Sequence, residues 1–369
     1  MTINNIKLVN FRNFKSLELN FTPQINLIVA ENGSGKTNIL ESIRMMCYGK
    51  PIFFTRETDI INFDILQTKL PFTKVIAKWE KNSENESIYT LSPNTRPIKA
   101  LTQNGQKTTY RNFIGQFTSV WFSPETINVI TQSPRHRRDL LDSYFCQIST
   151  EYFIALNQYQ KSIEARNRVL KIQDKFYLKN LLPKYDKILA RSGQELISIK
   201  RKLVLDLSQA VEQASKKQKR YEICFIHESS IPLHDIFDEN IYVTFMLQLA
   251  ENQEKDIAMK RTNVGPHKDN WTLSLKDFSI GESYDLRFYG SRGQKRMGLL
   301  IFTLAIVALL EQARGSKPVL LLDDVVSELD DENIGLIIDM LHATDQQSII
   351  TSTHREIPGL EKVNLIILK

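Results

Sequence analysis

Near its start the chain reads INLIVAENGSGKT over residues 25–37. The apolar run 25–29 predicts a buried strand, and the apolar residues that recur over 39–43 predict a helix after the glycines. In a strand, glycine turn and helix of this kind, backbone N–H groups and the positive helix N-terminus face phosphate groups. A lysine adds positive charge at the β- and γ-phosphates, and the hydroxyl after it reaches Mg²⁺. The segment therefore predicts a nucleoside triphosphate site in which Lys36 and Thr37 take these roles.

We expect the whole phosphate loop and the residue after it to contact the nucleotide. These residues are Ala30, Glu31, Asn32, Gly33, Ser34, Gly35, Lys36, Thr37 and Asn38. Ala30 stands where such loops usually begin with glycine. Because alanine resists a positive backbone φ, we expect it to be tolerated if φ at this position is negative. A glycine turn that binds no ligand is the simpler alternative.

A strand near the C-terminus supplies the second part of the site, and it reads VLLLDD over residues 319–324. The four apolar residues predict a fully buried strand, which brings Asp323 and Asp324 to the sheet edge where open α/β sheets bind ligands. We expect Asp323 to hold Mg²⁺ and Asp324 to act catalytically by orienting the attacking water. Two acidic residues that merely cap a strand are the alternative, which the phosphate loop in the same chain disfavours.

Residues 290–294, which read GSRGQ, supply the third part. They open the apolar segment 297–310, which we expect to form a buried helix. Ser291, Gly293 and Gln294 are therefore predicted to lie at a helix N-terminus, where backbone N–H groups and the helix dipole bind a γ-phosphate. Arg292 places a bulky charge inside this element, which departs from the usual Leu-Ser-Gly-Gly-Gln.

The spacing of the three parts narrows the type of ATPase. Most of the chain lies between Lys36 and Asp323, which is unusual for Ras-like and RecA-like ATPases. A large insertion, then a Ser-x-Gly-Gln element, then the aspartate strand is the order found in ABC-type ATPases. In these enzymes the element faces the nucleotide of a second subunit, so we predict an ATP-dependent homodimer in which Ser291 completes the catalytic site of the other copy. Residues 327–330, SELD, match the loop at this interface and add Asp330 to the nucleotide contacts.

Composition favours a cytoplasmic protein. The chain has 369 residues and a net charge of +6, which is a modest bias towards polyanionic partners. We find neither the pattern of a signal peptide nor an apolar run long enough to cross a membrane. The three cysteines stand singly among apolar neighbours, so we expect buried thiols rather than disulfides or zinc ligands.

Hydrophobic periodicity divides the chain into three regions. Residues 1–125 and 221–369 carry alternating apolar runs and the nucleotide motifs, so both are predicted to belong to one α/β ATPase lobe. Residues 126–220 carry a helical stripe that resumes after Pro183, and they are predicted to form an inserted, basic helical lobe. Aromatic residues of the stripe, such as Tyr152 and Tyr159, fall on its apolar phase, so we expect them in the core rather than on a base-stacking surface.

Several segments resemble the RecF family of bacterial recombination mediators, and the resemblance covers nearly the whole chain. The segments are NFRNF at 10–14, FSPE at 122–125, SPRHRRDLLD at 133–142, RN at 166–167, GPHKDN at 265–270, LLLDDV at 320–325 and SELD at 327–330. The resemblance implies an ABC-type head related to SMC proteins, with mixed sheets around the phosphate loop and a mainly helical second lobe. It also adds Arg12 to the expected nucleotide contacts and Ser123 to the expected metal contacts.

By family, the protein is expected to bind ATP and Mg²⁺, to dimerise on double-stranded and gapped DNA, and to hydrolyse ATP slowly with stimulation by DNA. It would act with RecR and RecO at gaps to help RecA displace single-strand binding protein. The basic clusters of the middle region then become contacts to DNA phosphates. These candidates are Arg135, Arg137, Arg138, Lys200, Arg201, Lys202, Lys216, Lys217, Lys219 and Arg220. A charge run that is only a solvated face is the alternative.

Some residues depart from the family pattern. Lys268 and Asn270 replace an arginine and an aspartate, which removes a bidentate fork and a carboxylate. Asp324 stands where transporters and SMC proteins usually carry glutamate, and the side chain that is one methylene shorter predicts slow hydrolysis. Two other classes stay open on the sequence alone: a transporter nucleotide-binding subunit and a scaffold of the same family that does not hydrolyse ATP.

Overall fold

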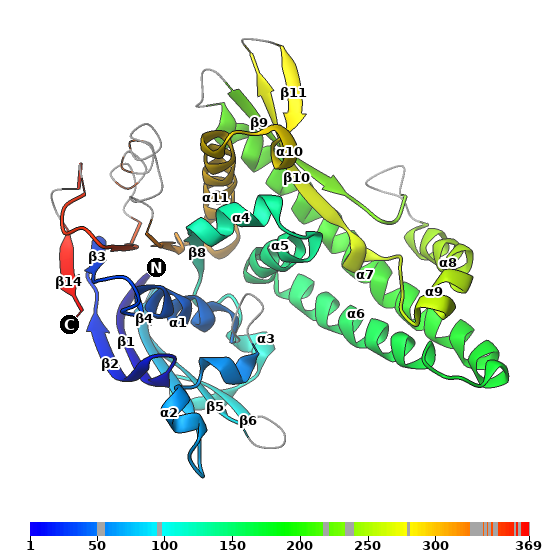
Figure 1. The fold of residues 1–369 in the computed structure, drawn as a ribbon, viewed down its shortest axis with the longest axis horizontal. Helices are drawn as coiled ribbons and strands as arrows, with labels where there is room; N and C mark the ends of the chain where they lie inside the picture. Colours follow the sequence, from blue (N-terminus) through cyan, green and yellow to red (C-terminus); the bar gives the residue numbers. More distant parts are fainter. Residues whose placement is uncertain are drawn as a thin grey trace. The chain divides into compact units, whose positions relative to one another are not determined.

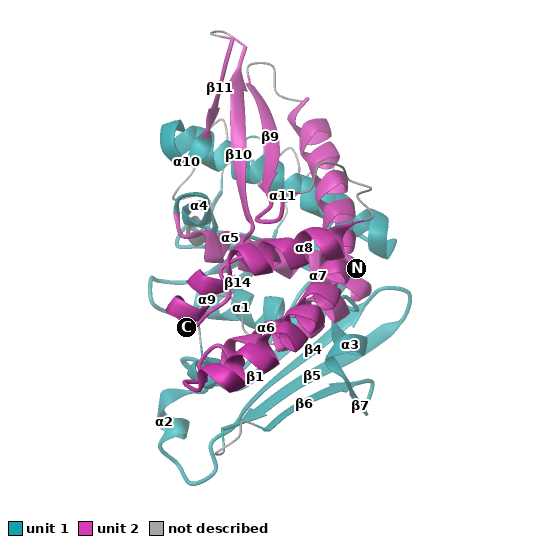
Figure 2. Cartoon of the chain, turned by 90° about the vertical axis from the view of Figure 1, so that its right-hand side faces the viewer, with its two compact units in different colours: residues 1–131, 286–369 teal, residues 132–285 magenta. Residues whose placement is uncertain are grey.

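The computed structural model of the protein describes residues 1–49, 56–93, 98–216, 221–232, 240–278, 281–324, 335, 338, 341, 346–357, 359–360 and 363–368. The chain divides into two compact units (Figure 2). Unit 1 contains residues 1–131 and 286–369, and unit 2 contains residues 132–285. The boundary expected at residue 220 falls inside unit 2, because the strands after it pair with one another and pack on the long helix before it.

A parallel sheet forms the centre of unit 1 (Figure 1). Its strand order is β14 (Asn364–Ile367), β3 (Ile25–Val29), β13 (Ser348–Ser352), β12 (Val319–Leu322) and β8 (Ser119–Phe122). Every residue of β3, β8, β12 and β13 is buried, as the apolar run of β12 and the largely apolar run of β3 predict for a sheet covered on both faces. The strands predicted at 25–29 and 319–322 are confirmed.

A second, antiparallel sheet completes the β structure of unit 1. Its order is β2 (Phe14–Asn20), β1 (Thr2–Phe11), β4 (Thr73–Glu80), β5 (Glu84–Ser92), β6 (Ile98–Gln103) and β7 (Gln106–Thr108). Buried Gln347 joins the two sheets. Its side-chain oxygen accepts a hydrogen bond from the Ile3 amide at 2.7 Å, and its side-chain nitrogen donates to the Ile3 carbonyl at 2.8 Å. Strand β1 is thereby held to the start of β13.

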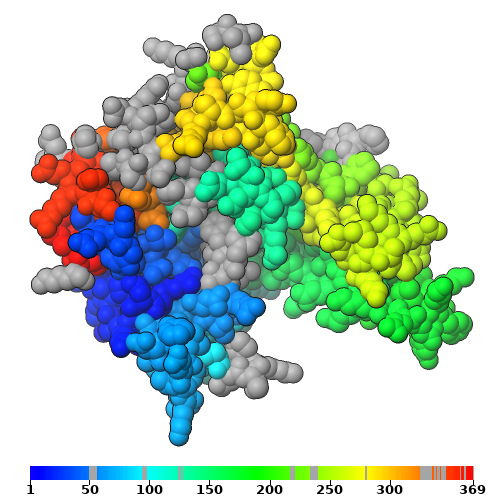
Figure 3. Space-filling view, viewed as in Figure 1, coloured from blue at the N-terminus to red at the C-terminus, as the bar shows by residue number. Residues whose placement is uncertain are grey.

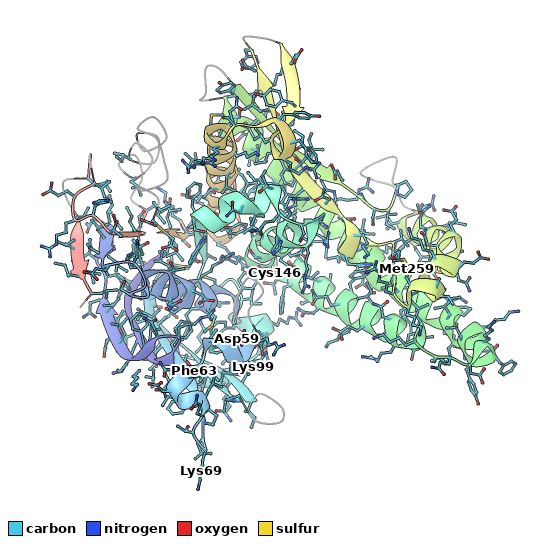
Figure 4. The ribbon with its side chains drawn as sticks, viewed as in Figure 1. Asp59, Phe63, Lys69, Lys99, Cys146 and Met259 are labelled. Atoms are coloured by element: carbon cyan, nitrogen blue, oxygen red, sulfur yellow. The ribbon has the colours of Figure 1, made fainter. Side chains whose placement is uncertain are left out.

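The helices of unit 1 include α1 (Lys36–Tyr48), α4 (Pro124–Thr131), α10 (Leu286–Tyr289) and α11 (Arg292–Arg314). Short helices η1 (Glu57–Ile60), α2 (Phe63–Leu66) and α3 (Tyr110–Phe113) lie between strands. Figure 4 shows exposed Phe63 and Lys69 at the edge of the unit, on and after α2. By length and composition α11 could cross a membrane, but 67% of its apolar window is buried inside the protein, as the predicted core helix requires.

Unit 2 is built on three helices, α5 (Pro134–Ile148), α6 (Thr150–Val169) and α7 (Lys175–Ser215). Its sheet has the order β11 (Glu282–Asp285), β10 (Asn270–Asp277) and β9 (Tyr221–Glu228), and α8 (Ile241–Glu251), α9 (Gln253–Met259) and η2 (Pro266–Lys268) complete the unit. Tyr152 and Tyr159 are buried, so their predicted place in the core is confirmed.

Pro183 lies inside α7. The helix continues through it, because a proline removes one backbone hydrogen bond while buried Leu182 and Leu189 continue one packed stripe. One expectation about the cysteines is wrong. The thiols of Cys47 and Cys146 are buried, but Cys224 is exposed, since it points to the open face of β9. Figure 4 places Cys146 on α5.

A buried ion network ties the helices of unit 2 together. The Arg166 side chain is fully buried and donates to Asp186 on α7 and to Asp256 on α9, each at 2.6 Å. It also donates to the Thr262 hydroxyl at 2.8 Å, and Asn167 accepts from the same hydroxyl and from the Thr262 amide. The Arg-Asn pair of the sequence therefore fixes the segment that leads into residues 265–270.

Asp269 is the second polar centre of unit 2. Its carboxylate accepts from the Lys200 ammonium at 2.8 Å and from the Ser230 amide at 2.9 Å. Burial acts to raise the pKa of this carboxyl, but Lys200 and His227 outweigh it and hold the pKa well below its ordinary value. The ion pair therefore persists through the physiological pH range.

Replacing Arg166 by methionine should lower the free energy of unfolding by about 3–5 kcal/mol, because two buried carboxylates lose their cation. Urea titration measures this loss. Arg168→Ala, at an exposed position on the same helix, is the control and should change stability by no more than about 0.5 kcal/mol. Equal effects of the two variants would show that the network does not hold the unit.

His267 should make unit 2 sensitive to acid. Its Nε2 donates to the Thr262 carbonyl, its Nδ1 accepts from Tyr159, and burial lowers its pKa from 6.5 to about 4. Because the folded protein binds this proton less readily than the unfolded chain, stability is lost as the pH falls from about 6.5 towards 4. Between pH 7 and 4.5, the free energy of unfolding of His267→Gln should fall by about 2 kcal/mol less than that of the unsubstituted protein. Parallel stability curves for the two proteins would contradict this assignment.

Candidate nucleotide-binding site

The phosphate loop joins β3 to α1, as predicted. Gly33 and Gly35 have φ values of 81° and 99°, which other residues rarely adopt. A Cβ atom on Gly35 would lie 2.5 Å from the Asn13 side chain, so glycine is also required there by space. Ala30 is not among the described residues with positive φ, which meets the condition set for its tolerance. Its amide donates to the Ser352 carbonyl at 3.3 Å, where β3 and β13 end side by side.

Lys36 is folded back into this loop. Its ammonium donates to the carbonyls of Ala30 at 2.6 Å and Glu31 at 2.9 Å, and the residue is 7% exposed. The positive charge is therefore held at the mouth of the loop, beside the N-terminus of α1, where both favour an anion.

Thr37 and Asp323 meet although they lie at opposite ends of the chain. The Thr37 hydroxyl donates to one carboxylate oxygen of Asp323 at 2.7 Å, and the Thr351 hydroxyl donates to the other at 2.6 Å. The Asp324 amide in turn donates to the Thr351 hydroxyl at 3.0 Å. Thr351 thus positions both acidic residues, and the sequence reading missed it because a threonine at the end of a strand carries no distinctive pattern.

The oxygen atoms of Thr37 and Asp323 fit a magnesium ion, which prefers oxygen ligands and uses few protein side chains alongside phosphate oxygens and water. The described residues contain no group of three or more His, Cys, Asp and Glu side chains suited to a metal. Ser123 lies at the same sheet edge, because Phe122 pairs with Leu322 in the parallel register. Its hydroxyl accepts from the Thr126 amide at 3.3 Å and so caps α4.

Arg12 supports the site from outside the loop. Its guanidinium makes two hydrogen bonds to the Glu41 carboxylate on α1, at 2.9 and 2.8 Å, and a third to the Asp59 carbonyl at 3.0 Å. Its backbone has φ 53°, and these contacts hold that uncommon conformation. The neighbouring Asn13 donates to the Ser34 carbonyl at 2.9 Å and accepts from Asn38 at 2.8 Å. The hairpin between β1 and β2 therefore buttresses the phosphate loop.

The GSRGQ element has the predicted helical position. Ser291 is the N-cap of α11, where its hydroxyl accepts from the Gln294 amide at 3.2 Å and the Gln294 side chain accepts from the Ser291 amide at 2.9 Å. This capping box satisfies amide groups of the first turn. Ser291 and Arg292 are exposed and Gly293 is partly exposed, so the helix N-terminus is accessible.

The basic candidates of the middle region separate into buried and accessible residues. The structure excludes Arg137 and Lys200 as contacts to DNA phosphates, because both are almost fully buried. Arg137 donates to Asn270 at 2.8 Å and to the Gln132 carbonyl at 2.6 Å, and Lys200 pairs with Asp269. The accessible candidates are Arg135, Arg138, Arg201, Lys202 and Lys216.

Some predicted residues lie outside the described part of the chain. They are Asp330 of the SELD segment and the basic residues Lys217, Lys219 and Arg220.

Known proteins resemble this chain along almost its whole length. A family model described as RecF/RecN/SMC N terminal domain matches residues 2–364. The protein is 32% identical to a DNA replication and repair protein RecF of Clostridium tetani over 98% of this chain and 94% of that protein. It is 31% identical to a RecF of Clostridioides difficile over 97% of this chain and 94% of that protein.

Two solved structures have the same fold. The recombination mediator protein RecF-ATPrS matches 100% of this chain and 96% of its own with a TM-score of 0.86 and 29% identity. RecF-ATP of the RecFOR pathway matches 96% of this chain and 93% of its own with a TM-score of 0.82. The predicted α/β head with mixed sheets and a helical lobe is confirmed. With a matching family model, relatives above 30% identity along almost their whole length and the same fold, this chain belongs to the RecF family.

Proposed function

We propose that the protein is an ATP-controlled clasp on DNA that serves recombinational repair and replication-fork maintenance. ATP would bind in the phosphate loop and close a homodimer on double-stranded DNA near gaps, and slow hydrolysis would release it. The observation that carries this proposal is the Thr37–Asp323 hydrogen bond of 2.7 Å beside the folded-back Lys36, because it assembles a phosphate and metal site from both ends of the chain.

In the proposed reaction the loop amides and Lys36 bind the triphosphate, and the oxygen atoms of Thr37 and Asp323 that now share a hydrogen bond would hold Mg²⁺. The ion would neutralise phosphate charge. Asp324 accepts a proton from the attacking water or orients it, and Thr351 fixes its backbone. Since an aspartate reaches less far than the usual glutamate, we expect slow turnover.

The accessible N-terminus of α11 supports the proposed dimer. Ser291, Gly293 and the helix dipole can bind the γ-phosphate of a nucleotide held by a second copy. Such a site is complete only when two chains meet, which makes ATP part of the interface. We expect DNA to stimulate ATP hydrolysis. We also expect RecR, with RecO, to bind the protein as a partner and to help RecA load. This activity would take place in the cytoplasm, in association with the nucleoid.

Membership of the RecF family disfavours a transporter subunit. A scaffold that does not hydrolyse ATP is the remaining alternative, because Ala30 and Arg292 depart from the usual ATPase pattern. Measuring ATP turnover in the presence of gapped DNA distinguishes the two, because a scaffold should show none.

Lys36→Ala should abolish ATP binding, because the buried ammonium that faces the phosphates is lost. Asp324→Asn should keep ATP binding, lower turnover by at least about tenfold and prolong the dimer, because the proposed base is removed. Calorimetry and phosphate release measure the two effects. Lys15→Ala, at an exposed lysine of the same unit, is the control. A fully active Asp324→Asn protein would exclude Asp324 as the base.

The accessible arginines and lysines of unit 2 should bind DNA phosphates rather than bases. The double variant Arg135→Ala with Lys202→Ala should weaken binding equally for different duplex sequences, and should reduce the slope of log K against log salt by about 1.8. Lys179→Ala with Lys187→Ala removes the same charge at exposed positions outside the candidate set. If the control variant reduces the salt slope by the same amount, DNA binding depends on net charge alone and Arg135 and Lys202 are not specific phosphate contacts.

A further inference from the structure

Two aromatic rings stand exposed directly before the N-terminus of α11. Phe288 is 72% exposed and Tyr289 is 75% exposed, and their ring centroids lie 6.3 Å apart in an edge-to-face arrangement. They belong to α10, which reaches the surface in the yellow part of the space-filling view (Figure 3). Large aromatic side chains usually bury most of their area in a protein core or an interface, so a ligand or a partner is expected to cover this pair.

The rings are held in a fixed relation to Ser291. Leu286 at the start of α10 is fully buried and anchors the turn. A Cβ atom on Gly290 would lie 2.9 Å from the Leu286 carbonyl oxygen and 2.7 Å from its side chain, so only glycine fits directly after α10. Ser291 then begins α11 through its capping box with Gln294. Because two residues of chain span at most about 7 Å, the Tyr289 ring stays beside the group that Ser291 binds.

The charge around the rings is positive. The Arg287 guanidinium lies 5.1 Å from the centre of the Phe288 ring, and Arg292, Lys295 and Arg296 follow within the first turns of α11. The sequence has no acidic residue between positions 286 and 296. Exposed aromatic rings among cations fit a ligand that combines a planar base with negative charge. A nucleoside triphosphate has both features, and the rings lie within three residues of Ser291, the residue proposed to bind its γ-phosphate.

We propose that Phe288 and Tyr289 form a platform on which the base of the nucleotide in a second copy of this chain stacks. The inference rests on the proposed two-chain site, and it names a part of that site which the ATPase motifs do not contain. In each half of the dimer Ser291 binds the γ-phosphate, and the two rings cover the base of the same nucleotide. The dimer thereby recognises the base as well as the triphosphate.

The probe is 2-aminopurine riboside triphosphate, whose fluorescence falls when its base stacks on another ring. We expect quenching when the protein dimerises and recovery of the fluorescence in the double variant Phe288→Ala with Tyr289→Ala. The double variant should also weaken dimerisation in ATP, measured by sedimentation, by at least about 25-fold, because each stacking contact is worth at least about fivefold and a symmetric dimer has two.

The matched control is another exposed pair on α7. Phe176 and Tyr177 are 74% and 60% exposed, with ring centroids 6.1 Å apart in an edge-to-face arrangement. Phe176→Ala with Tyr177→Ala should leave both the quenching and the dimer unchanged.

A mixed dimer tests whether the platform acts between chains. Lys36→Ala protein cannot hold the probe but keeps its rings, whereas the double variant at 288 and 289 holds the probe without rings. Mixing the two should restore quenching in the one complete site. Quenching that needs the rings and the phosphate loop in the same chain would overturn the proposal.

Two other results would also overturn it. One is an unchanged dimer in the double variant. The other is a loss of single-stranded DNA binding without any change in the dimer, which would assign the rings to DNA bases. The unsubstituted protein could also bind ATP through Lys36, as a loss of ATP binding in Lys36→Ala would show, and yet stay monomeric. In that case the proposed two-chain site does not form, and the stacking platform is excluded as well.

Discussion

The hydrogen bond between Thr37 and Asp323 is the constraint on which the nucleotide site depends. It forms because β13 lies between β3 and β12 in one parallel sheet, so the strand that leads into the phosphate loop and the strand that delivers the two aspartates end at the same edge. Thr351, at the end of β13, holds the other oxygen of Asp323 and the amide of Asp324. Three strands that are distant in sequence must therefore pair in register before any catalytic group is in place.

Unit 2 depends on buried charge rather than on apolar packing alone. Arg166 joins three segments, and Asp269 joins α7, β9 and the loop before β10. A buried ion pair contributes little net stability compared with apolar residues, but losing one partner is costly. These networks therefore favour one arrangement of the helices. They also explain the family motifs in this unit, since the RN pair and the GPHKDN segment supply residues of the networks.

Most of the fold of the described residues could be predicted, because unbroken apolar runs and helical stripes report burial directly. The phosphate loop and the Asp323 position followed from residue types whose chemistry is specific. Side-chain partners could not be predicted in the same way. Arg137 and Lys200 look like surface charges in the sequence, yet Asn270 and Asp269 reach them from more than sixty residues away. Thr351, Asn13 and Glu41 were missed for the same reason, since each becomes important only when the fold brings its partner near.

The most direct test of a nucleotide-controlled clasp is the molar mass in solution, measured by light scattering with ATP, with ADP and without nucleotide, each with and without gapped duplex DNA. The account predicts a monomer of 42.7 kDa without ATP, and a dimer with ATP that also assembles on DNA. A protein that stays monomeric under every condition, or that dimerises equally without ATP, would contradict it.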